Sequence, residues 1–141
     1  MLAYFDTSAL VPLLVAEPTS GECRRAWDAA DTVLATRLAY VEAAAALARA
    51  ERAGTRRQVD AALDLLDELW PEIRVIEIDE SLVRTAAGYA RRFGLRGYDA
   101  VHCAAAALLA GPTTVAVSAD RQMLAAWSEL GVLTLDPGRD S

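Results

Sequence analysis

Short apolar runs alternate with longer amphipathic segments along this chain. The first run, Leu2–Phe5, is apolar or aromatic at every position and is followed directly by Asp6. A strand that is apolar on both faces of its pleat is typical of a parallel sheet covered on both sides. The expected strands comprise residues 2–5, 31–35, 73–78, 114–117 and 132–135.

The segments between these runs have the spacing of amphipathic helices. In the segment 37–53 the apolar side chains fall on one stripe, and Gly54 follows where a left-handed residue commonly ends a helix. Hydroxyl or acidic residues precede several segments, so we expect Thr7 with Ser8, Thr36, Thr55 and Asp79 to cap them, with Pro12 in the first turn of the first helix. The expected helices comprise residues 7–13, 22–30, 37–53, 56–69, 80–93, 97–110 and a last helix after Asp120.

Strands separated by helices indicate right-handed crossovers and therefore an α/β fold. The order of elements predicts one parallel sheet of four to five strands with helices on both faces. A chain of 141 residues is long enough to bury a core of its own. The sequence has neither an internal repeat nor a low-complexity linker, so we expect residues 1–141 to form a single domain.

The overall charge restricts how this protein could bind a nucleic acid. Its formal net charge is −6, whereas binding through a broad electrostatic surface requires an excess of basic residues. Any contact with nucleic acid would have to be local, with metal ions in an acidic cleft and arginines around it. All 14 basic residues are arginine, and lysine is absent.

Cysteine usage and hydropathy point to a cytoplasmic protein. Cys23 and Cys103 have neither the spacing of metal ligands nor that of a disulfide framework, so we expect reduced thiols. No window approaches the ~20 apolar residues of a membrane span, and the first residues lack the basic region of a signal peptide. We therefore expect a soluble protein with no membrane partner.

Four acidic residues occupy positions where functional sites form. Asp6 and Asp120 each follow a strand, Asp99 falls in the first turn of a helix, and Glu42 lies at the edge of the buried stripe of another. Ligands bind at the carboxyl ends of parallel strands in open α/β sheets. If the first and fourth strands are neighbours, the four carboxylates can converge on one cleft. Taken singly, each acid could equally be a helix cap or a solvated side chain.

Converging carboxylates require a positive partner. Two of them ~5 Å apart repel by about 3 kcal/mol at an effective dielectric constant of ~20. An all-oxygen set of ligands favours a hard cation, so we expect Mg²⁺, with Mn²⁺ as a possible substitute. Such a centre suits phosphodiester hydrolysis, in which the metal activates water and stabilises the leaving oxygen.

The local sequences around these acids resemble those of a known family. Asp6-Thr7-Ser8-Ala9-Leu10, the helix of Glu42, Tyr98-Asp99-Ala100 and Ser118-Ala119-Asp120-Arg121 resemble, in order and spacing, the four acidic motifs of PIN-domain ribonucleases. The chain length and helix layout are similar to those of VapC-type toxins of type II toxin–antitoxin systems.

This resemblance implies a metal-dependent endoribonuclease with Asp6, Glu42, Asp99 and Asp120 at the family's acidic positions. It also implies a PIN-like three-layer sandwich with strand order 3-2-1-4-5, a homodimer, and inhibition by a cognate antitoxin whose C-terminal segment lies over the active-site groove. The hydroxyls of Thr7, Ser8 and Ser118 would orient the acids.

Other polar residues near the motifs have two possible interpretations. His102 lies three residues after Asp99 and shares its helix face, so it could be a ligand or a proton shuttle. The apolar residues around it favour a packed core histidine, and Cys103 is expected in the core as well. Arg37, Arg96 and Arg121 neighbour acidic positions and could contact RNA phosphates, although solvated arginines would have the same pattern.

The sequence also bears on three other functions. Phosphoryl-transfer domains with a strand-ending aspartate use a lysine to bind the phosphate, and related hydrolases carry a second acid where Ser8 stands here. The absence of lysine argues against both. A catalytically silent PIN-like binding module would be indicated by loss of an acid, but all four are present. A housekeeping RNA-processing nuclease without a toxin role remains an alternative.

Overall fold

The computed structural model describes residues 1–57 and 59–139. Its strands form one parallel sheet in the order β3-β2-β1-β4-β5, which confirms the predicted fold class and strand order. The strands are β1 (Leu2–Phe5), β2 (Thr32–Thr36), β3 (Ile73–Ile76), β4 (Thr114–Val117) and β5 (Leu133–Leu135). The helices are α1 (Thr7–Leu14), α2 (Ser20–Ala29), α3 (Leu38–Arg52), α4 (Asp60–Leu69), α5 (Glu80–Phe93), α6 (Gly97–Leu108) and α7 (Arg121–Glu129), with a short 3-10 helix at Trp70–Glu72.

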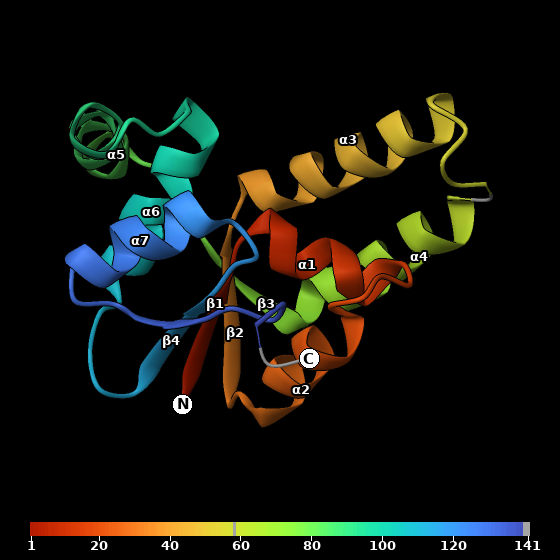
Figure 1. The fold of residues 1–141 in the computed structure, drawn as a ribbon, viewed down its shortest axis with the longest axis horizontal. Helices are drawn as coiled ribbons and strands as arrows, with labels where there is room; N and C mark the ends of the chain where they lie inside the picture. The colour runs from red at the N-terminus through yellow and green to blue at the C-terminus, as the bar shows by residue number, and fades with distance from the viewer. Residues whose placement is uncertain (58, 140–141) are drawn as a thin grey trace.

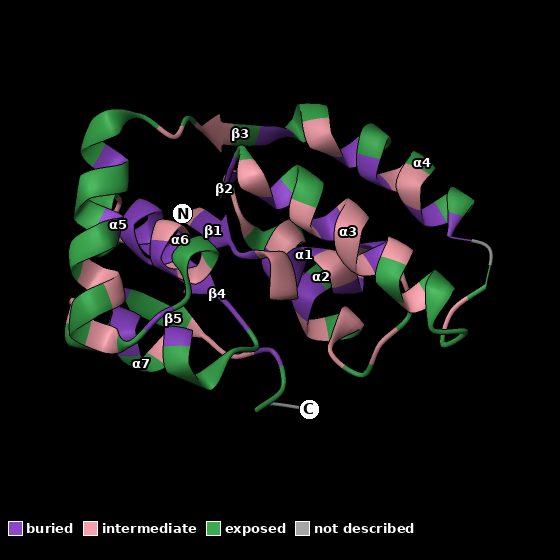
Figure 2. Ribbon diagram, turned by 90° about the horizontal axis from the view of Figure 1, so that it is seen from above, coloured by how far each residue is buried: buried purple, intermediate pink, exposed green. Residues whose placement is uncertain are grey.

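The helices cover both faces of the sheet, as expected for a buried parallel sheet (Figure 1). Successive side chains of β1 point to opposite faces, so Ala3 and Phe5 pack with residues of α1–α4 while Tyr4 packs with α5–α7. Figure 2 shows that β1 and much of α6 are buried, whereas α5 has a largely exposed outer surface. The sheet therefore forms the middle layer of a three-layer sandwich.

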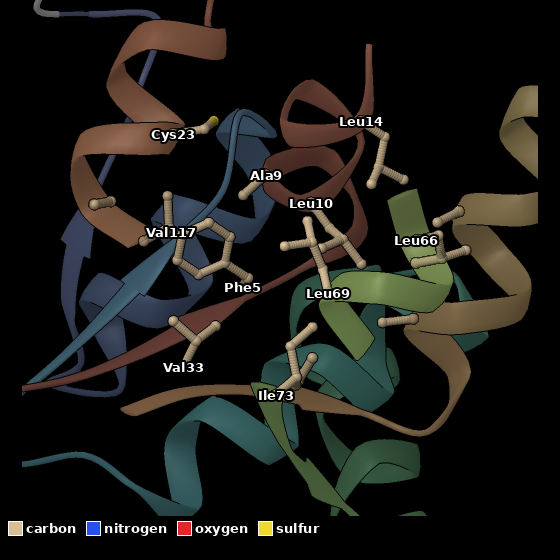
Figure 3. Packing of buried hydrophobic residues seen from close by; sticks show 14 of the residues in the cluster. Phe5, Ala9, Leu10, Leu14, Cys23, Val33, Leu66, Leu69, Ile73 and Val117 are labelled. Carbon is tan, nitrogen blue, oxygen red and sulfur yellow. The ribbon is translucent and has the colours of Figure 1, made fainter. Parts of the chain in front are cut away.

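Two apolar clusters, one on each face, hold the layers together. On the α1–α4 face Phe5 packs with Leu10 of α1 and Leu66 of α4, which are all fully buried (Figure 3). On the other face the ring of Trp127 lies edge-on to that of Tyr4, with 6.0 Å between their centroids. Cys103 lies in this second cluster as expected, and burial raises the pKa of its thiol to about 11.

The cap of α1 differs from the prediction. Asp6, rather than Thr7 or Ser8, is the N-cap, and its Oδ1 accepts a hydrogen bond from the backbone N–H of Ala9 at 3.2 Å. A carboxylate is as good a cap as a hydroxyl, and it stands at the first position after the strand. Because the helix begins at Thr7, Pro12 lies in its second turn and not in its first.

Two threonines that were predicted to cap helices have other structural roles. Thr36 belongs to β2 and is buried, so it does not cap α3. Thr55 donates from its hydroxyl to the carbonyl of Ala50 and thereby closes the end of α3, while α4 begins only at Asp60. In contrast, the predicted cap at Asp79 is confirmed, because its Oδ1 accepts from the N–H of Leu82 at 2.8 Å.

None of the helices within the described ranges has both the length and the apolarity needed to cross a membrane.

Truncation of a core leucine tests the packing on the α1–α4 face. Leu10 is fully buried whereas Leu108 is 67% exposed. We expect Leu10→Ala to lower the free energy of unfolding by about 2–5 kcal/mol, because it leaves a cavity beneath the sheet. Leu108→Ala is the matched control and should change it by less than about 0.5 kcal/mol. Urea denaturation measures both, and equal losses would contradict this packing.

Candidate active site

The predicted acids gather at the carboxyl edge of the sheet. Asp6 follows β1 and Asp120 follows β4, and these two strands are paired neighbours. Asp99 lies in the first turn of α6, and Glu42 lies in the second turn of α3. The electrostatic influence of Asp120 and Glu42 on Asp99 indicates that the three carboxylates share one region.

Asp6 is held by hydroxyls on both carboxylate oxygens. Ser8 Oγ donates to its Oδ1 at 2.6 Å, and Ser118 Oγ donates to its Oδ2 at 2.5 Å. Asp6 is only 4% exposed. Burial raises the pKa of Asp6 even though the charge of His102 and these hydrogen bonds act in the opposite direction. The site therefore contains one acid that is fixed in place and costly to ionise.

Glu42 is held by a second network, which passes through His102. His102 Nε2 lies 2.6 Å from Glu42 Oε1, and the hydroxyl of Thr7 donates to the same oxygen at 3.0 Å. The other ring nitrogen, Nδ1, lies 2.6 Å from the hydroxyl of Tyr4. Burial alone would raise the pKa of Glu42, but the hydrogen bond and charge of His102 and the Thr7 hydroxyl hold it below its usual value.

His102 thus has a role that sequence reasoning did not identify. The residue is only 1% exposed, as expected of a core histidine, but its ring also joins the buried Tyr4 to Glu42. The sequence contains one indication of this role: His102 comes one helical turn after Asp99, which places it on the side of α6 that faces the acids. The identity of its partner depended on the packing of α6 near α3.

Asp99 and Asp120 are the more accessible acids. Asp99 is half-buried and Asp120 is exposed. Partial burial and the charge of Asp120 raise the pKa of Asp99, Glu42 adds to the effect, and His102 and Arg96 oppose it. Asp120 also caps α7 by accepting from the N–H of Met123 at 3.1 Å. Asp99 is therefore a carboxylate whose charge is poorly compensated by the protein itself.

The oxygen atoms of these acids are ligands that a hard divalent cation prefers, although they are not yet close enough together to coordinate one. No group of three His, Cys, Asp or Glu side chains in the described residues is already close enough to hold a metal ion. Both oxygens of Asp6 and the Oε1 of Glu42 accept hydrogen bonds from the surrounding hydroxyls and His102. Burial raises the pKa of Asp6, and burial together with the charges of Asp120 and Glu42 raises the pKa of Asp99; a cation would favour the ionised form of both.

The three predicted arginines differ in their surroundings. Arg37 forms an exposed ion pair with Glu77, so its guanidinium already has a partner. Arg96 is close enough to Asp99 to lower the pKa of that carboxyl. Arg121 directly follows Asp120 and lines a hollow beside it. The positions of Arg96 and Arg121 are therefore the more suitable for contact with a substrate.

A small hollow adjoins Glu42 on the other flank of the acids. It has a volume of about 220 Å³ and is bordered by Tyr98 and by side chains of α3. Tyr98 and Val41 are 62% and 57% exposed, and both line this hollow. This surface offers apolar contacts immediately beside an acidic residue.

Comparisons with known proteins identify the family of this chain. The PIN domain profile matches residues 3–126. Ribonuclease VapC45 of Mycobacterium tuberculosis is 38% identical over 125 residues, which cover 86% of each chain. The crystal structure of PAE2754 from Pyrobaculum aerophilum has a TM-score of 0.69 and 25% identity over 95% of this chain and 92% of that one. A chain of a toxin–antitoxin complex from Klebsiella pneumoniae has a TM-score of 0.68 and 15% identity over 96% and 97% of the two chains. The match to the PIN domain and the identity with a VapC ribonuclease establish that this chain belongs to the PIN-domain family, among its VapC-type ribonucleases.

Proposed function

We propose that this protein is a Mg²⁺-dependent endoribonuclease and the toxin of a toxin–antitoxin pair. The observation that carries the proposal is the placement of Asp6, Glu42, Asp99 and Asp120 at one edge of the sheet, where the charges of Asp120 and Glu42 add to burial in raising the pKa of Asp99. Its relationship to a VapC ribonuclease supports RNA as the substrate. The sequences of the four acidic motifs also support the assignment as a ribonuclease.

The four acids would hold Mg²⁺, or Mn²⁺ in its place. The ion would supply a water activated for attack on the phosphodiester and neutralise charge on the phosphate. Ser8 and Ser118 fix the carboxylate of Asp6 through both oxygens. Thr7 and His102 fix Oε1 of Glu42, and among the described residues no hydrogen bond reaches its Oε2. These contacts keep two ligands in position before the substrate arrives.

The exposed acids would face the substrate. Asp99 and Asp120 are more accessible than Asp6, and their mutual repulsion is a reason for the site to recruit a cation. Arg96 and Arg121, which lie beside them in the chain, would donate hydrogen bonds to RNA phosphates. Arg37 is a weaker candidate for this contact because Glu77 already pairs with it.

The cognate antitoxin would cover the acids, and the enzyme would act as a cytoplasmic homodimer. A structural relative from Klebsiella pneumoniae that belongs to a toxin–antitoxin complex supports the idea of a protein partner. The exposed Tyr98 and Val41 beside Glu42 provide an apolar surface for such a partner. A non-catalytic binding module is less consistent with the site, because all four acids are present and three of them interact electrostatically.

Replacement of an acid tests the catalytic proposal. Asp99→Asn should lower Mg²⁺-dependent cleavage of RNA by at least about a hundred-fold, because it removes a ligand charge while keeping the side-chain shape. Asp6→Asn should have the same effect. Gel analysis of labelled RNA incubated with purified protein measures cleavage. Asp64→Asn, which changes an exposed acid of α4, is the matched control and should remain active.

Two results would contradict the catalytic proposal. One is cleavage that continues in both Asp99→Asn and Asp6→Asn. The other is cleavage by the parent protein that is unaffected by EDTA, since a chelator should remove the ion on which the reaction depends.

The stability of Asp99→Asn should depend on pH in a defined direction. The pKa of Asp99 is raised in the folded state, so the parent protein loses stability as pH rises above about 4 and the carboxyl ionises. Asparagine carries no such charge. Without metal, the variant should therefore melt a few degrees higher than the parent near pH 7, and the difference should vanish near pH 3. Thermal melts measure this, and Mg²⁺ should raise the Tm of the parent more than that of the variant.

Growth experiments test the toxin assignment separately. Expression of the parent without a partner should arrest growth, whereas expression of Asp99→Asn should not, because RNA cleavage is the proposed cause of arrest. Colony counts after induction measure the difference. Normal growth of cells that contain active enzyme would instead indicate a housekeeping nuclease.

A further inference from the structure

A larger hollow opens on the α7 side of the acid cluster, between the start of that helix and a turn that follows β5. Its volume is about 650 Å³. Three parts of the chain line it: the segment from the end of β4 into α7, the turn after β5 and the loop before α2. The lining includes Ala119, Arg121, Leu124, Asp136, Arg139 and Thr19. It adjoins a second hollow of about 300 Å³ that shares Leu124, Asp136 and Arg139 and extends along α7. Figure 1 shows α7 next to the sheet, with β4 leading into it.

The wall of this hollow is the same short segment that supports the acids. Ser118 donates to Asp6, and the N–H of Asp120 donates to Ser118 Oγ at 3.0 Å. Between them, Ala119 lines the hollow, and its N–H donates to Ser8 Oγ at 2.9 Å. The next residue after Asp120 is Arg121. Successive residues are 3.8 Å apart along the chain, so a group bound in the hollow lies close to the acids.

The hollow is positively charged although the chain as a whole is acidic. Arg121 and Arg139 both line it, and neither has an ion-pair partner in the part of the chain that the structure describes. Asp136 is the acid among its described lining residues. Its Oδ1 accepts from the N–H of Gly138 at 2.9 Å, and its carbonyl accepts from the N–H of Arg139 at 3.2 Å. Asp136 therefore shapes the turn that presents Arg139.

We propose that this hollow binds a backbone phosphate of the RNA strand next to the phosphate that is cleaved, with Arg121 and Arg139 donating to its oxygens. The guanidinium fork matches phosphate geometry and holds it by paired hydrogen bonds. A contact of this kind positions the strand without reading its sequence. The adjoining hollow along α7 gives the strand a path away from the acids. This inference rests on the proposed ribonuclease function, because that function supplies the polyanionic substrate.

Binding of intact RNA tests the subsite. Fluorescence anisotropy of a short labelled single-stranded RNA of mixed sequence is measured with Asp99→Asn protein, which should leave the RNA uncut. Added to this background, Arg121→Gln or Arg139→Gln should each weaken binding about three- to five-fold. Each should also reduce the slope of log affinity against log salt by about 0.7, the value for one phosphate contact on a single strand.

One further variant should act in the opposite direction. Asp136→Asn removes the negative charge from the hollow, while its amide oxygen can still accept from Gly138 N. It should therefore strengthen RNA binding. Arg74→Gln is the matched control for loss of one positive charge, because Arg74 is exposed on β3 at the opposite edge of the sheet. It should leave affinity unchanged, and thermal melts check that all variants are folded.

Several outcomes would overturn the subsite. One is an equal loss of RNA affinity in Arg74→Gln and Arg121→Gln. Another is a slope of log affinity against log salt that does not change in Arg121→Gln or Arg139→Gln. A third is failure of the Asp99→Asn protein to bind RNA at all. Weakened inhibition by an antitoxin with RNA binding unaffected would assign the hollow to a protein partner instead. Failure of the parent to cleave RNA would overturn the proposed function alone, since these binding measurements do not depend on cleavage.

Discussion

The pairing of β1 with β4 is the constraint on which the site depends. The register that places Phe5 opposite Val117 brings Asp6 and Ser118 to the same edge, where the serine hydroxyl reaches the carboxylate. β1 is the central strand, with β2 and β4 on either side, so an acid at its end is buried by the layers around it. A shift of one residue in this register would turn every side chain of β1 to the opposite face and separate the two residues.

The acids experience different environments even though they lie together. Asp6 is buried and fixed at both oxygens, the pKa of Glu42 is held below its usual value by His102 and Thr7, and the pKa of Asp99 is raised by burial and by Asp120. This spread has a structural cause, because the buried acids have nearby hydroxyl or imidazole donors. His102 also links the layers: it lies on α6, bonds to Tyr4 in β1, and contacts Glu42 on α3. The fold and the electrostatics of the site are therefore supported by the same hydrogen bonds.

Local patterns in the sequence were sufficient for the elements but not for their side-chain contacts. The apolar runs predicted the strands, and the position of each acid after a strand or at a helix start predicted where it would lie. The strand order came from the resemblance to PIN domains. The predicted caps of α1, α3 and α4 were wrong. Asp6 caps α1, Thr36 belongs to β2, and Thr55 bonds to the end of α3. The contact of His102 with Glu42 joins residues 60 positions apart and depends on tertiary packing, which no local pattern reports.

The segment from Ser118 to Arg121 has a consequence for how this protein can diversify. Its backbone and hydroxyl groups serve Asp6 and Ser8, so changes there would alter the chemical centre together with the adjoining wall. The turn at Asp136–Arg139 lines the same hollow from a separate part of the chain, where Asp136 accepts from the N–H groups of Gly138 and Arg139. Sequence changes in that turn can therefore reshape the hollow without replacing the residues that hold Asp6.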